Sequence, residues 1–231
     1  MNPARIAQLL EPFFAGHARG EAATGESISP LSAKQLEQIS MYIDLLLRWN
    51  ARVNLTAIRT AEEIVTRHFG ESLFAARNLP LTGIGEPGTA SVSSHGRLID
   101  VGSGAGFPGI AIQIWSPATP VTLIESNQKK VAFLREVMRT ITLTDINVFS
   151  SRAEDHPPAV ASIVTLRAVE RFDKILPSAA RLLTVPGTLA LLIGSAQLSQ
   201  AQRVLPSFSW SKPAPIPLSS NRILVCAERS K

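Results

Sequence analysis

The segment that most constrains the fold is a short apolar run that leads directly into a glycine-rich turn. Residues 98–101 have the composition of a buried strand, residues 102–106 carry glycine at every second position, and Pro108 stands where a first helical turn should begin. Glycine lets such a turn bend sharply and lets a ligand approach the backbone without obstruction by side chains. The segment therefore predicts a strand, a ligand-binding loop over residues 102–106, and a helix.

The spacing of the glycines distinguishes two classes of cofactor. The dinucleotide pattern G-x-G-x-x-G requires a third glycine at position 107, which is Phe107 in this chain. The S-adenosylmethionine pattern is G-x-G-x-G preceded by an acid, and Asp100, Gly102, Gly104 and Gly106 satisfy it. We therefore expect S-adenosylmethionine as the cofactor, with Asp100 helping to orient its cationic amino-acid tail. An oxidoreductase that uses NAD ranks last.

A second acid follows the loop at a useful distance. Glu125 ends the next predicted strand, close to the interval of ~20 residues at which an acid reaches a pair of ribose hydroxyls. The alternative is a solvated residue at a strand end, but the loop upstream favours a ribose contact by Glu125.

From residue 97 onward, short β-branched runs alternate with segments of helical length. This pattern predicts an α/β fold of the Rossmann-like class I methyltransferase type, with a mostly parallel seven-stranded sheet and helices on both faces. The prolines between Pro213 and Pro217 disfavour a central strand and indicate a turn into the last edge pairing. The predicted strands are 97–101, 121–125, 146–149, 162–166, 188–193 and 222–227, and the predicted helices are 108–115, 127–140, 171–183 and 197–205.

The first third of the chain is predicted to be helical. A short helix is expected over 3–15, and a linker rich in Gly, Ala and Ser over 16–30. Ser32 with Gln35 forms a capping box for a helix over about 32–50, and Thr60 with Glu63 opens another that extends to about residue 78. We therefore expect a helical N-terminal segment over 1–79, a flexible connection over 80–96, and a methyltransferase domain over 97–231.

Charge and cysteine content narrow the partners and the compartment. The formal net charge of +5 favours a polyanionic partner, although an ordinary basic surface would explain it equally well. Cys226 is the only cysteine, which excludes an intramolecular disulfide and a cysteine-rich zinc site. We find no secretion signal and no apolar run of membrane-spanning length, so we expect a cytoplasmic monomer without a metal or a membrane anchor.

Several ordered segments between Trp49 and about Arg222 match one known pattern. The matching segments are Trp49-Asn50, 54–59, His68, Ser72, 100–109, 130–134, 151–154, Arg167-Ala168, Pro186-Gly187 and 222–225. Together they resemble the RsmG (GidB) family of bacterial 16S rRNA guanine-N7 methyltransferases, with a connection over 80–96 that is longer than usual. The resemblance implies transfer of a methyl group from S-adenosylmethionine to N7 of a guanosine, guanosine 527 of the small-subunit rRNA, with 16S rRNA or the small ribosomal subunit as partner.

The resemblance also implies which residues contact the cofactor. It assigns contacts to Gly102, Phe107, Ala153, Glu154 and Arg167. An acid at Glu154 could accept from the adenine amino group while Ala153 offers a backbone donor. The alternatives are a helix-initiating acid for Glu154 and a structural arginine, paired with a carboxylate, for Arg167.

On the substrate side, the matches are basic residues that could hold RNA phosphates. They are Arg152, Arg167 and Arg222, with Arg59 and His68 from the helical segment. For His68 a satisfied buried histidine is the favoured alternative to an RNA ligand.

Two residues near these basic positions, Asn54 and Ile193, bear on how RNA would bind. We expect Asn54 to hold the helical segment against the core rather than to touch RNA. The family usually has lysine where this chain has Ile193, so the missing cation weakens RNA binding unless a neighbour such as Lys174 or Lys212 replaces it.

The chemistry of the target explains the lack of a catalytic dyad. Guanine N7 has an in-plane lone pair and no proton, so the enzyme needs only to align it with the methyl group and to exclude water. Methylation of exocyclic amines would leave an Asn/Asp-Pro-Pro-aromatic motif where the chain has 165–168, and cytosine C5 chemistry would need a cysteine there. The remaining alternatives are a methyltransferase of another substrate and a non-catalytic RNA-binding module.

Overall fold

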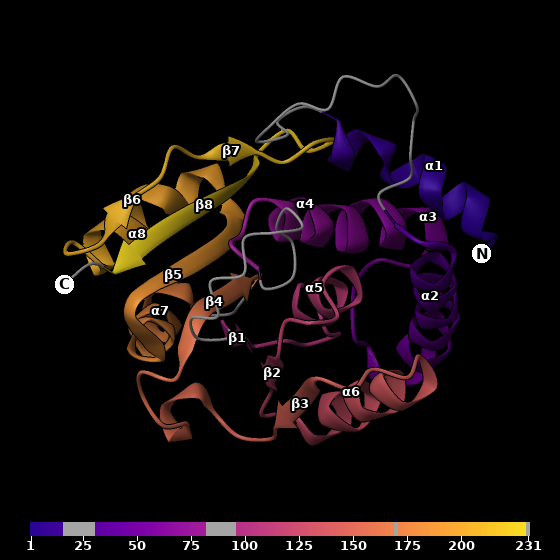
Figure 1. The fold of residues 1–231 in the computed structure, drawn as a ribbon, viewed down its shortest axis with the longest axis horizontal. Helices are drawn as coiled ribbons and strands as arrows, with labels where there is room; N and C mark the ends of the chain where they lie inside the picture. Colours follow the sequence, from indigo (N-terminus) through magenta and orange to yellow (C-terminus); the bar gives the residue numbers. More distant parts are fainter. Residues whose placement is uncertain (16–30, 82–95, 169–170, 230–231) are drawn as a thin grey trace, which may run out of the picture.

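Figure 1 shows the computed structural model, which describes residues 1–15, 31–81, 96–168 and 171–229. The predicted linker over 16–30 and positions 82–95 of the predicted connection lie outside the described residues. No helix in the described ranges is both long enough and apolar enough to cross a membrane. The N-terminal part contains α1 (Pro3–Phe14), α2 (Ala33–Val53), the three-residue α3 (Ala61–Glu63), the π-helical segment η1 (Ile64–Gly70) and α4 (Glu71–Arg77).

The predicted mostly parallel sheet is confirmed. Its order is β3-β2-β1-β4-β5-β8-β6, in which β1 to β5 are parallel and β8 runs antiparallel beside β5. Because the chain reverses its strand order between β1 and β4, the carboxyl ends of these strands open a crevice there, where α/β sheets bind ligands. The strands are β1 (Leu98–Val101), β2 (Val121–Ile124), β3 (Ile146–Phe149), β4 (Ala161–Arg167), β5 (Leu183–Gly194), β6 (Ser209–Trp210), β7 (Ala214–Pro215) and β8 (Arg222–Arg229).

The sheet has eight strands instead of the predicted seven. The difference lies at one edge, where β6 and β7 both pair with β8, opposite Ala227 and Leu224 respectively. Pro213 lies between the two pieces and has no backbone N–H to donate, so the edge strand is interrupted.

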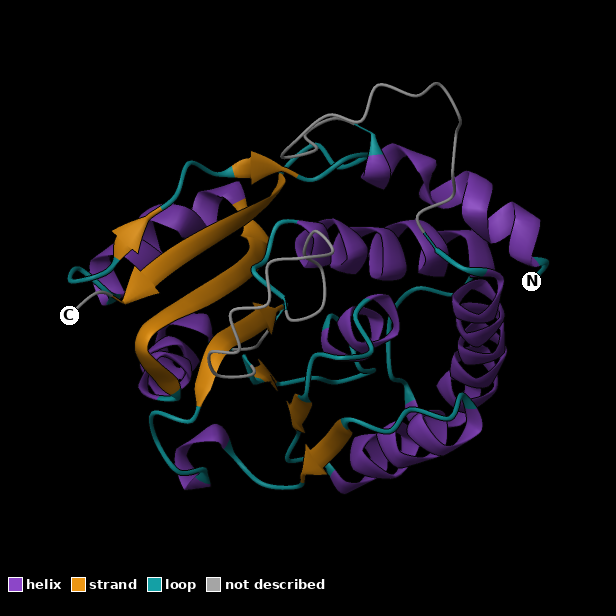
Figure 2. Ribbon diagram, in the orientation of Figure 1, coloured by secondary structure: helices purple, strands orange, loops and turns teal. Residues whose placement is uncertain are grey.

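Helices cover both faces of the sheet, as predicted (Figure 2). On one face, Leu98 and Leu123 belong to a core formed with α5 (Gly109–Trp115), α6 (Gln128–Thr140) and the N-terminal helices. On the other face, Ile99 and Val101 belong to a core formed with α7 (Phe172–Arg181) and α8 (Leu198–Val204). The alternation of side chains along β1 therefore supplies both layers. Short 3₁₀ turns, η2 (Ala153–Asp155) and η3 (Ser195–Gln197), complete the described elements.

The N-terminal helices begin largely where the sequence predicts. Ser32 caps α2 and Gln35 completes the capping box. The single helix predicted from Thr60 to about residue 78 is wrong in detail, because η1 interrupts it with a π-helical turn. Phe13 of α1 packs against the bare backbone of Gly70, where an added Cβ would lie 2.4 Å from the Phe13 ring. Such π-helical turns occur often at functional sites.

Candidate cofactor and substrate site

The glycine loop has the backbone conformation that the sequence predicts. Gly102, Gly104 and Gly106 have φ angles of 70°, 58° and 90°, a region that favours glycine. The N–H groups of Gly102 and Ser103 donate to the carbonyl of Ile124, at 2.9 and 3.1 Å, which holds the loop over the end of β2. Among the described residues, a Cβ on Gly104 would meet one atom within 4 Å, the Gly102 carbonyl oxygen at 3.8 Å, so the loop is open to them on that side.

Asp100 lies beneath the loop, fully buried. Its Oδ1 accepts from the Thr165 hydroxyl at 2.8 Å, and its Oδ2 accepts from the Gly109 N–H at 3.2 Å. Burial raises the pKa of the Asp100 carboxyl to about 6, while these hydrogen bonds act in the opposite direction. Asp100 thus connects β1, β4 and the start of α5 under the loop.

Glu125 is also held in place. Its Oε2 accepts from the Gly104 N–H at 2.9 Å and its Oε1 from the Asn127 N–H at 2.8 Å. Each carboxylate oxygen keeps a second lone pair, so Glu125 can still accept hydrogen bonds from a ligand.

The turn after β3 presents free backbone donors. In the part of the chain that the structure describes, neither the Ala153 N–H nor the Glu154 N–H has an acceptor. The Glu154 carboxylate accepts from the Ser178 hydroxyl at 2.8 Å. Arg181 donates to the Ala153 and Glu154 carbonyls at 3.0 and 2.9 Å, so a guanidinium from α7 fixes the turn. No motif in the sequence pointed to Arg181.

Phe107 lies inside an aromatic cluster and is 5% exposed. The rings of Tyr42 and His68 are both stacked on it, with centroids at 5.2 and 4.7 Å, and Phe69 meets it edge-on at 5.0 Å. The Arg167 guanidinium lies 5.9 Å from the ring centroid. The cluster joins α2 and η1 to the glycine loop, so the N-terminal helices support the loop directly.

Tyr42 is a supporting residue that the sequence analysis missed. Its hydroxyl donates to the Ala105 carbonyl inside the loop, and burial raises the pKa of the phenol well above its usual value. Tyr42 therefore remains a hydrogen-bond donor at every physiological pH. In the sequence it shares a predicted helix with the apolar residues Ile39 and Ile43, which gives no signal for its hydroxyl.

We expect Tyr42→Phe to lower the free energy of unfolding by about 1 kcal/mol, because the Ala105 carbonyl loses its donor. The affinity for S-adenosylmethionine should fall several-fold, as the loop loses a support. Urea unfolding and calorimetric titration measure the two effects. Tyr42→Leu, which also removes the stacked ring, should lose more stability and more cofactor affinity than Tyr42→Phe. If Tyr42→Phe matched the unchanged protein in both quantities, Tyr42 would not support the loop.

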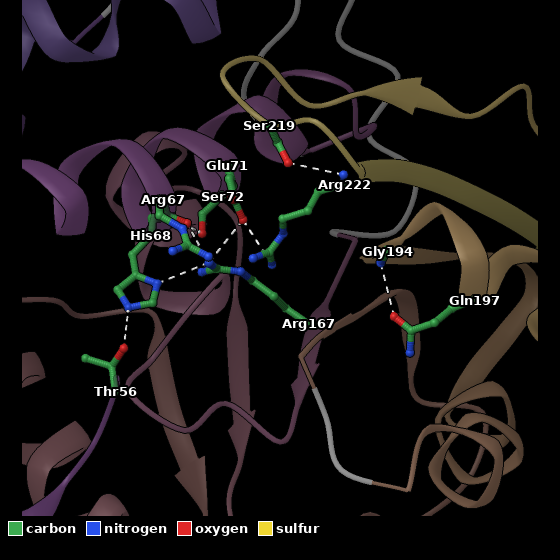
Figure 3. A network of polar contacts seen from close by, with 10 residues as sticks. All are labelled: Thr56, Arg67, His68, Glu71, Ser72, Arg167, Gly194, Gln197, Ser219 and Arg222. Carbon is green, nitrogen blue, oxygen red and sulfur yellow. Dashed lines mark hydrogen bonds and ion pairs between the residues drawn. The ribbon is translucent and has the colours of Figure 1, made fainter. Parts of the chain in front are cut away.

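Arg167 and Arg222 share one carboxylate (Figure 3). Glu71 Oε2 lies 3.1 Å from a guanidinium nitrogen of each. Glu71 and Arg167 are buried and Arg222 is partly exposed. Burial lowers the pKa of Arg167 to about 10, with Glu71 acting in the opposite direction, so Arg167 is a cation at neutral pH. The ion pair considered as the structural alternative for Arg167 is therefore present.

His68 is neutral and both of its ring nitrogens have partners. Arg167 has no acceptor atom, so it donates to His68 Nδ1 at 3.1 Å, and His68 Nε2 then carries the proton toward the Thr56 hydroxyl at 2.9 Å. Burial and the nearby arginines lower the pKa of His68 to about 2. This is the arrangement of a satisfied histidine, which orients Arg167 over Phe107.

A cavity of about 330 Å³ lies beside these arginines, at the carboxyl ends of β4 and β5 and the start of β8. Ile193 contributes an apolar wall and is 4% exposed, so the position of the family lysine is filled by a buried side chain. The lining residues are Arg67, Leu166, Arg167, Ala168, Phe172, Leu192, Ile193, Gly194, Gln197, Asn221 and Arg222.

The other predicted basic residues lie outside this cluster. Arg152 is exposed after β3, and neither Lys174 nor Lys212 lines the cavity. Arg59 donates to the Asn54 side chain at 3.1 Å, and Asn54 ends α2 in the left-handed conformation with a φ of 54°. The described residues contain no group of three or more His, Cys, Asp or Glu that could hold a metal ion.

Solved structures share the fold at low sequence identity. TYW2 of P. horikoshii, in complex with MeSAdo, has a TM-score of 0.54 at 13% identity, covering 71% of this chain and 63% of that one. A predicted O-methyltransferase from Agrobacterium tumefaciens has a TM-score of 0.51 at 19% identity, covering 62% of this chain and 77% of that one. These similarities support the Rossmann-like methyltransferase fold.

Sequence comparison identifies the family. The GidB family model, described as rRNA small subunit methyltransferase G, matches residues 35–213. A ribosomal RNA small subunit methyltransferase G of Chloroflexus aggregans is 36% identical over 208 residues, covering 85% of this chain and 82% of that protein. One from Halorhodospira halophila is 38% identical over 164 residues, covering 71% and 72%. The chain belongs to the rRNA small subunit methyltransferase G family.

Proposed function

We propose that this protein transfers a methyl group from S-adenosylmethionine to N7 of a guanosine in 16S rRNA, guanosine 527 by its resemblance to the family. The observation that carries the proposal is the basic cavity at the carboxyl ends of β4 and β5. It combines Arg67, Arg167 and Arg222 with apolar walls, as a site for one nucleotide of a polyanion requires. Family membership supports both the cofactor and the RNA substrate.

The residues around the loop fit S-adenosylmethionine. The loop is open above Gly104, and the Ala153 and Glu154 N–H groups are free donors within the described residues. We assign Glu125 to the ribose hydroxyls, and the turn at Ala153 and Glu154 to the adenine. Gly102 and Gly104 contribute the backbone surface.

Two residues assigned to the cofactor support this surface from below. Because Asp100 is fully buried beneath the loop, where its carboxylate accepts from Thr165 and Gly109, we assign it the positioning of the loop in place of a contact with the amino-acid tail. Phe107 is enclosed by Tyr42 and His68, so we expect its backbone to face the cofactor.

The cofactor supplies an electrophilic methyl group, and the protein supplies alignment. Guanine N7 has no proton to remove, and the site needs no general base. The low pKa of His68 and the cationic state of Arg167 suit groups that bind and orient, not groups that exchange protons. Cys226 lies within β8, and burial raises the pKa of its thiol to about 11, which does not suit a nucleophile.

We propose a cytoplasmic monomer that acts on 16S rRNA or on the small ribosomal subunit. We keep the division into a helical segment over 1–79, a connection over 80–96 and a methyltransferase domain over 97–231 as part of the proposal. The helical segment contributes to the site, because α2 carries Tyr42 and η1 carries His68 to the ring of Phe107 beside the loop.

Methyl transfer with labelled cofactor tests the substrate class. Label should enter 16S rRNA or small subunits, whereas a methyltransferase of small molecules or proteins would leave the RNA unlabelled. Calorimetric titration with S-adenosylmethionine tests the third possibility. RNA binding without cofactor binding would indicate a non-catalytic RNA-binding module.

Arg222→Ala tests the RNA side. We expect weaker RNA binding, and a salt dependence whose slope falls by about 1, because one partly exposed cation near the cavity is lost. Filter binding over a series of salt concentrations measures both. The control is Arg203→Ala, which removes an exposed arginine on α8. A change in stability alone, with RNA affinity and slope retained, would make Arg222 purely structural.

A further inference from the structure

Gln197 is a polar residue of the cavity whose amide orientation is fixed. It ends η3, directly after β5, and its Oε1 accepts from the Gly194 N–H at 3.1 Å (Figure 3). Because a backbone N–H can only donate, the amide oxygen must be the atom that faces Gly194. The Nε2 group is then a pure donor, and it makes no hydrogen bond within the described residues.

The surroundings of Gln197 suit a planar base. Ile193 and Phe172 line the same cavity and are 4% and 6% exposed, which provides buried apolar surface. A volume of about 330 Å³ is at the lower end of the range for small-ligand pockets, which begins at about 300 Å³. Arg167 and Arg222 are committed to Glu71. Of the two neutral amides that line the cavity, Gln197 and Asn221, Gln197 is the one whose orientation a hydrogen bond fixes within the described residues.

We propose that Gln197 determines base specificity, by donating from Nε2 to O6 of the target guanine. This inference rests on the proposed function. Guanine carries the O6 acceptor next to N7, whereas adenine carries an amino donor at the same place. A fixed donor therefore favours guanine, whose O6 accepts the hydrogen bond, over adenine, whose amino group would face it donor to donor. The hydrogen bond to O6 leaves the N7 lone pair free to attack the methyl group.

The end of β5 is apolar on the side of the cavity. Ile193 is buried there, and neither Lys174 nor Lys212 lines the cavity. Gln197, which lies shortly after β5, supplies a donor at this end of the strand. Because Nε2 can donate a hydrogen bond but cannot accept one, it pairs with the O6 of guanine and not with the amino group of adenine.

The test compares two changes at Gln197 on two RNA substrates. Gln197→Glu keeps an oxygen for the Gly194 N–H and replaces the free donor by an acceptor, and Gln197→Met removes both hydrogen bonds. The substrates are small-subunit RNAs with guanine or 2-aminopurine, which keeps N7 and lacks O6, at the methylated position. Gln202→Glu makes the same chemical change on the exposed side of α8.

For guanine, we expect Gln197→Glu to lower kcat/KM by roughly 10- to 100-fold and Gln202→Glu to leave it unchanged. The original protein should prefer guanine to 2-aminopurine, and in Gln197→Met this preference should shrink toward the intrinsic difference between the bases. Affinity for S-adenosylmethionine should be unchanged in all variants. The melting temperature should be unchanged in Gln197→Glu and Gln202→Glu, and slightly lower in Gln197→Met because that variant loses the hydrogen bond to the Gly194 N–H.

The two ideas fail in different ways. Methylation of guanine by Gln197→Glu at the original rate, or an unchanged preference in Gln197→Met, would overturn the role of Gln197 and leave the proposed function standing. A parallel loss of cofactor affinity would show that Gln197 supports the fold, and would overturn it as well. Absence of any RNA methylation by the original protein would overturn the proposed function, and the inference with it.

Discussion

Gly102→Asp is expected to abolish binding of S-adenosylmethionine in a protein that still folds. Gly102 is exposed in the loop with a φ of 70°, and its neighbour Gly104 is held by the Glu125 carboxylate. A second carboxylate would occupy the loop surface and repel the acceptor groups of the ligand. We expect a loss of at least about 100-fold, equivalent to roughly 2.7 kcal/mol of binding free energy.

Calorimetric titration measures this loss, and circular dichroism with thermal unfolding checks the fold. Gly102→Ala is the matched control, because it adds only a methyl group at the same φ. It should cost about 1–2 kcal/mol of stability from the left-handed backbone and should retain much of the affinity. A folded Gly102→Asp protein that binds S-adenosylmethionine as before would show that the loop is not the cofactor site.

Glu71→Ala should be the most destabilising change in the substrate side of the site. It removes the carboxylate that Arg167 and Arg222 share, and leaves the buried Arg167 guanidinium without a counter-ion. Removal of one partner from a buried ion pair typically costs about 3–5 kcal/mol. We expect a loss of this size in urea unfolding, together with a large fall in methyl transfer to RNA.

Two further variants separate charge from position. Glu71→Gln keeps an acceptor oxygen and removes the charge, so its loss should be intermediate. Glu62→Ala removes an exposed acid on α3 and should change stability by no more than about 0.5 kcal/mol. If Glu71→Ala were as stable as Glu62→Ala, the shared carboxylate would not hold the cluster together.

Local pattern was sufficient to predict most of the architecture. The strand before Gly102 lies where the run of apolar residues predicts it, and the helix after Ser32 begins where the capping residues predict it. The edge strand was harder, because its two-residue pieces β6 and β7 carry no periodic signal of their own. The π-helical turn at η1 also left no pattern in the sequence, and its contact with Phe13 at Gly70 joins residues far apart in the chain.

Residues of the candidate site could be located from the sequence where they directly follow a predicted strand. They could not be located where residues far apart in the sequence come into contact only in the folded chain. Gly102 and Glu125 follow β1 and β2, and their placement follows from the sheet. Glu71 lies in a helix that reads as an ordinary amphipathic segment, and its partners Arg167 and Arg222 come from distant strands. Tyr42 was missed for the same reason, because only the folded chain brings its hydroxyl to the loop.

Mapping the new methyl group on the RNA is the decisive test of the proposed reaction. Small ribosomal subunits that lack the N7 modification are incubated with the protein and S-adenosylmethionine, and the 16S rRNA is analysed for 7-methylguanosine by chemical cleavage and mass spectrometry. We predict one new methyl group, on N7 of guanosine 527, and none with Gly102→Asp. Unmodified RNA, or a methyl group on another atom or base, would contradict this prediction.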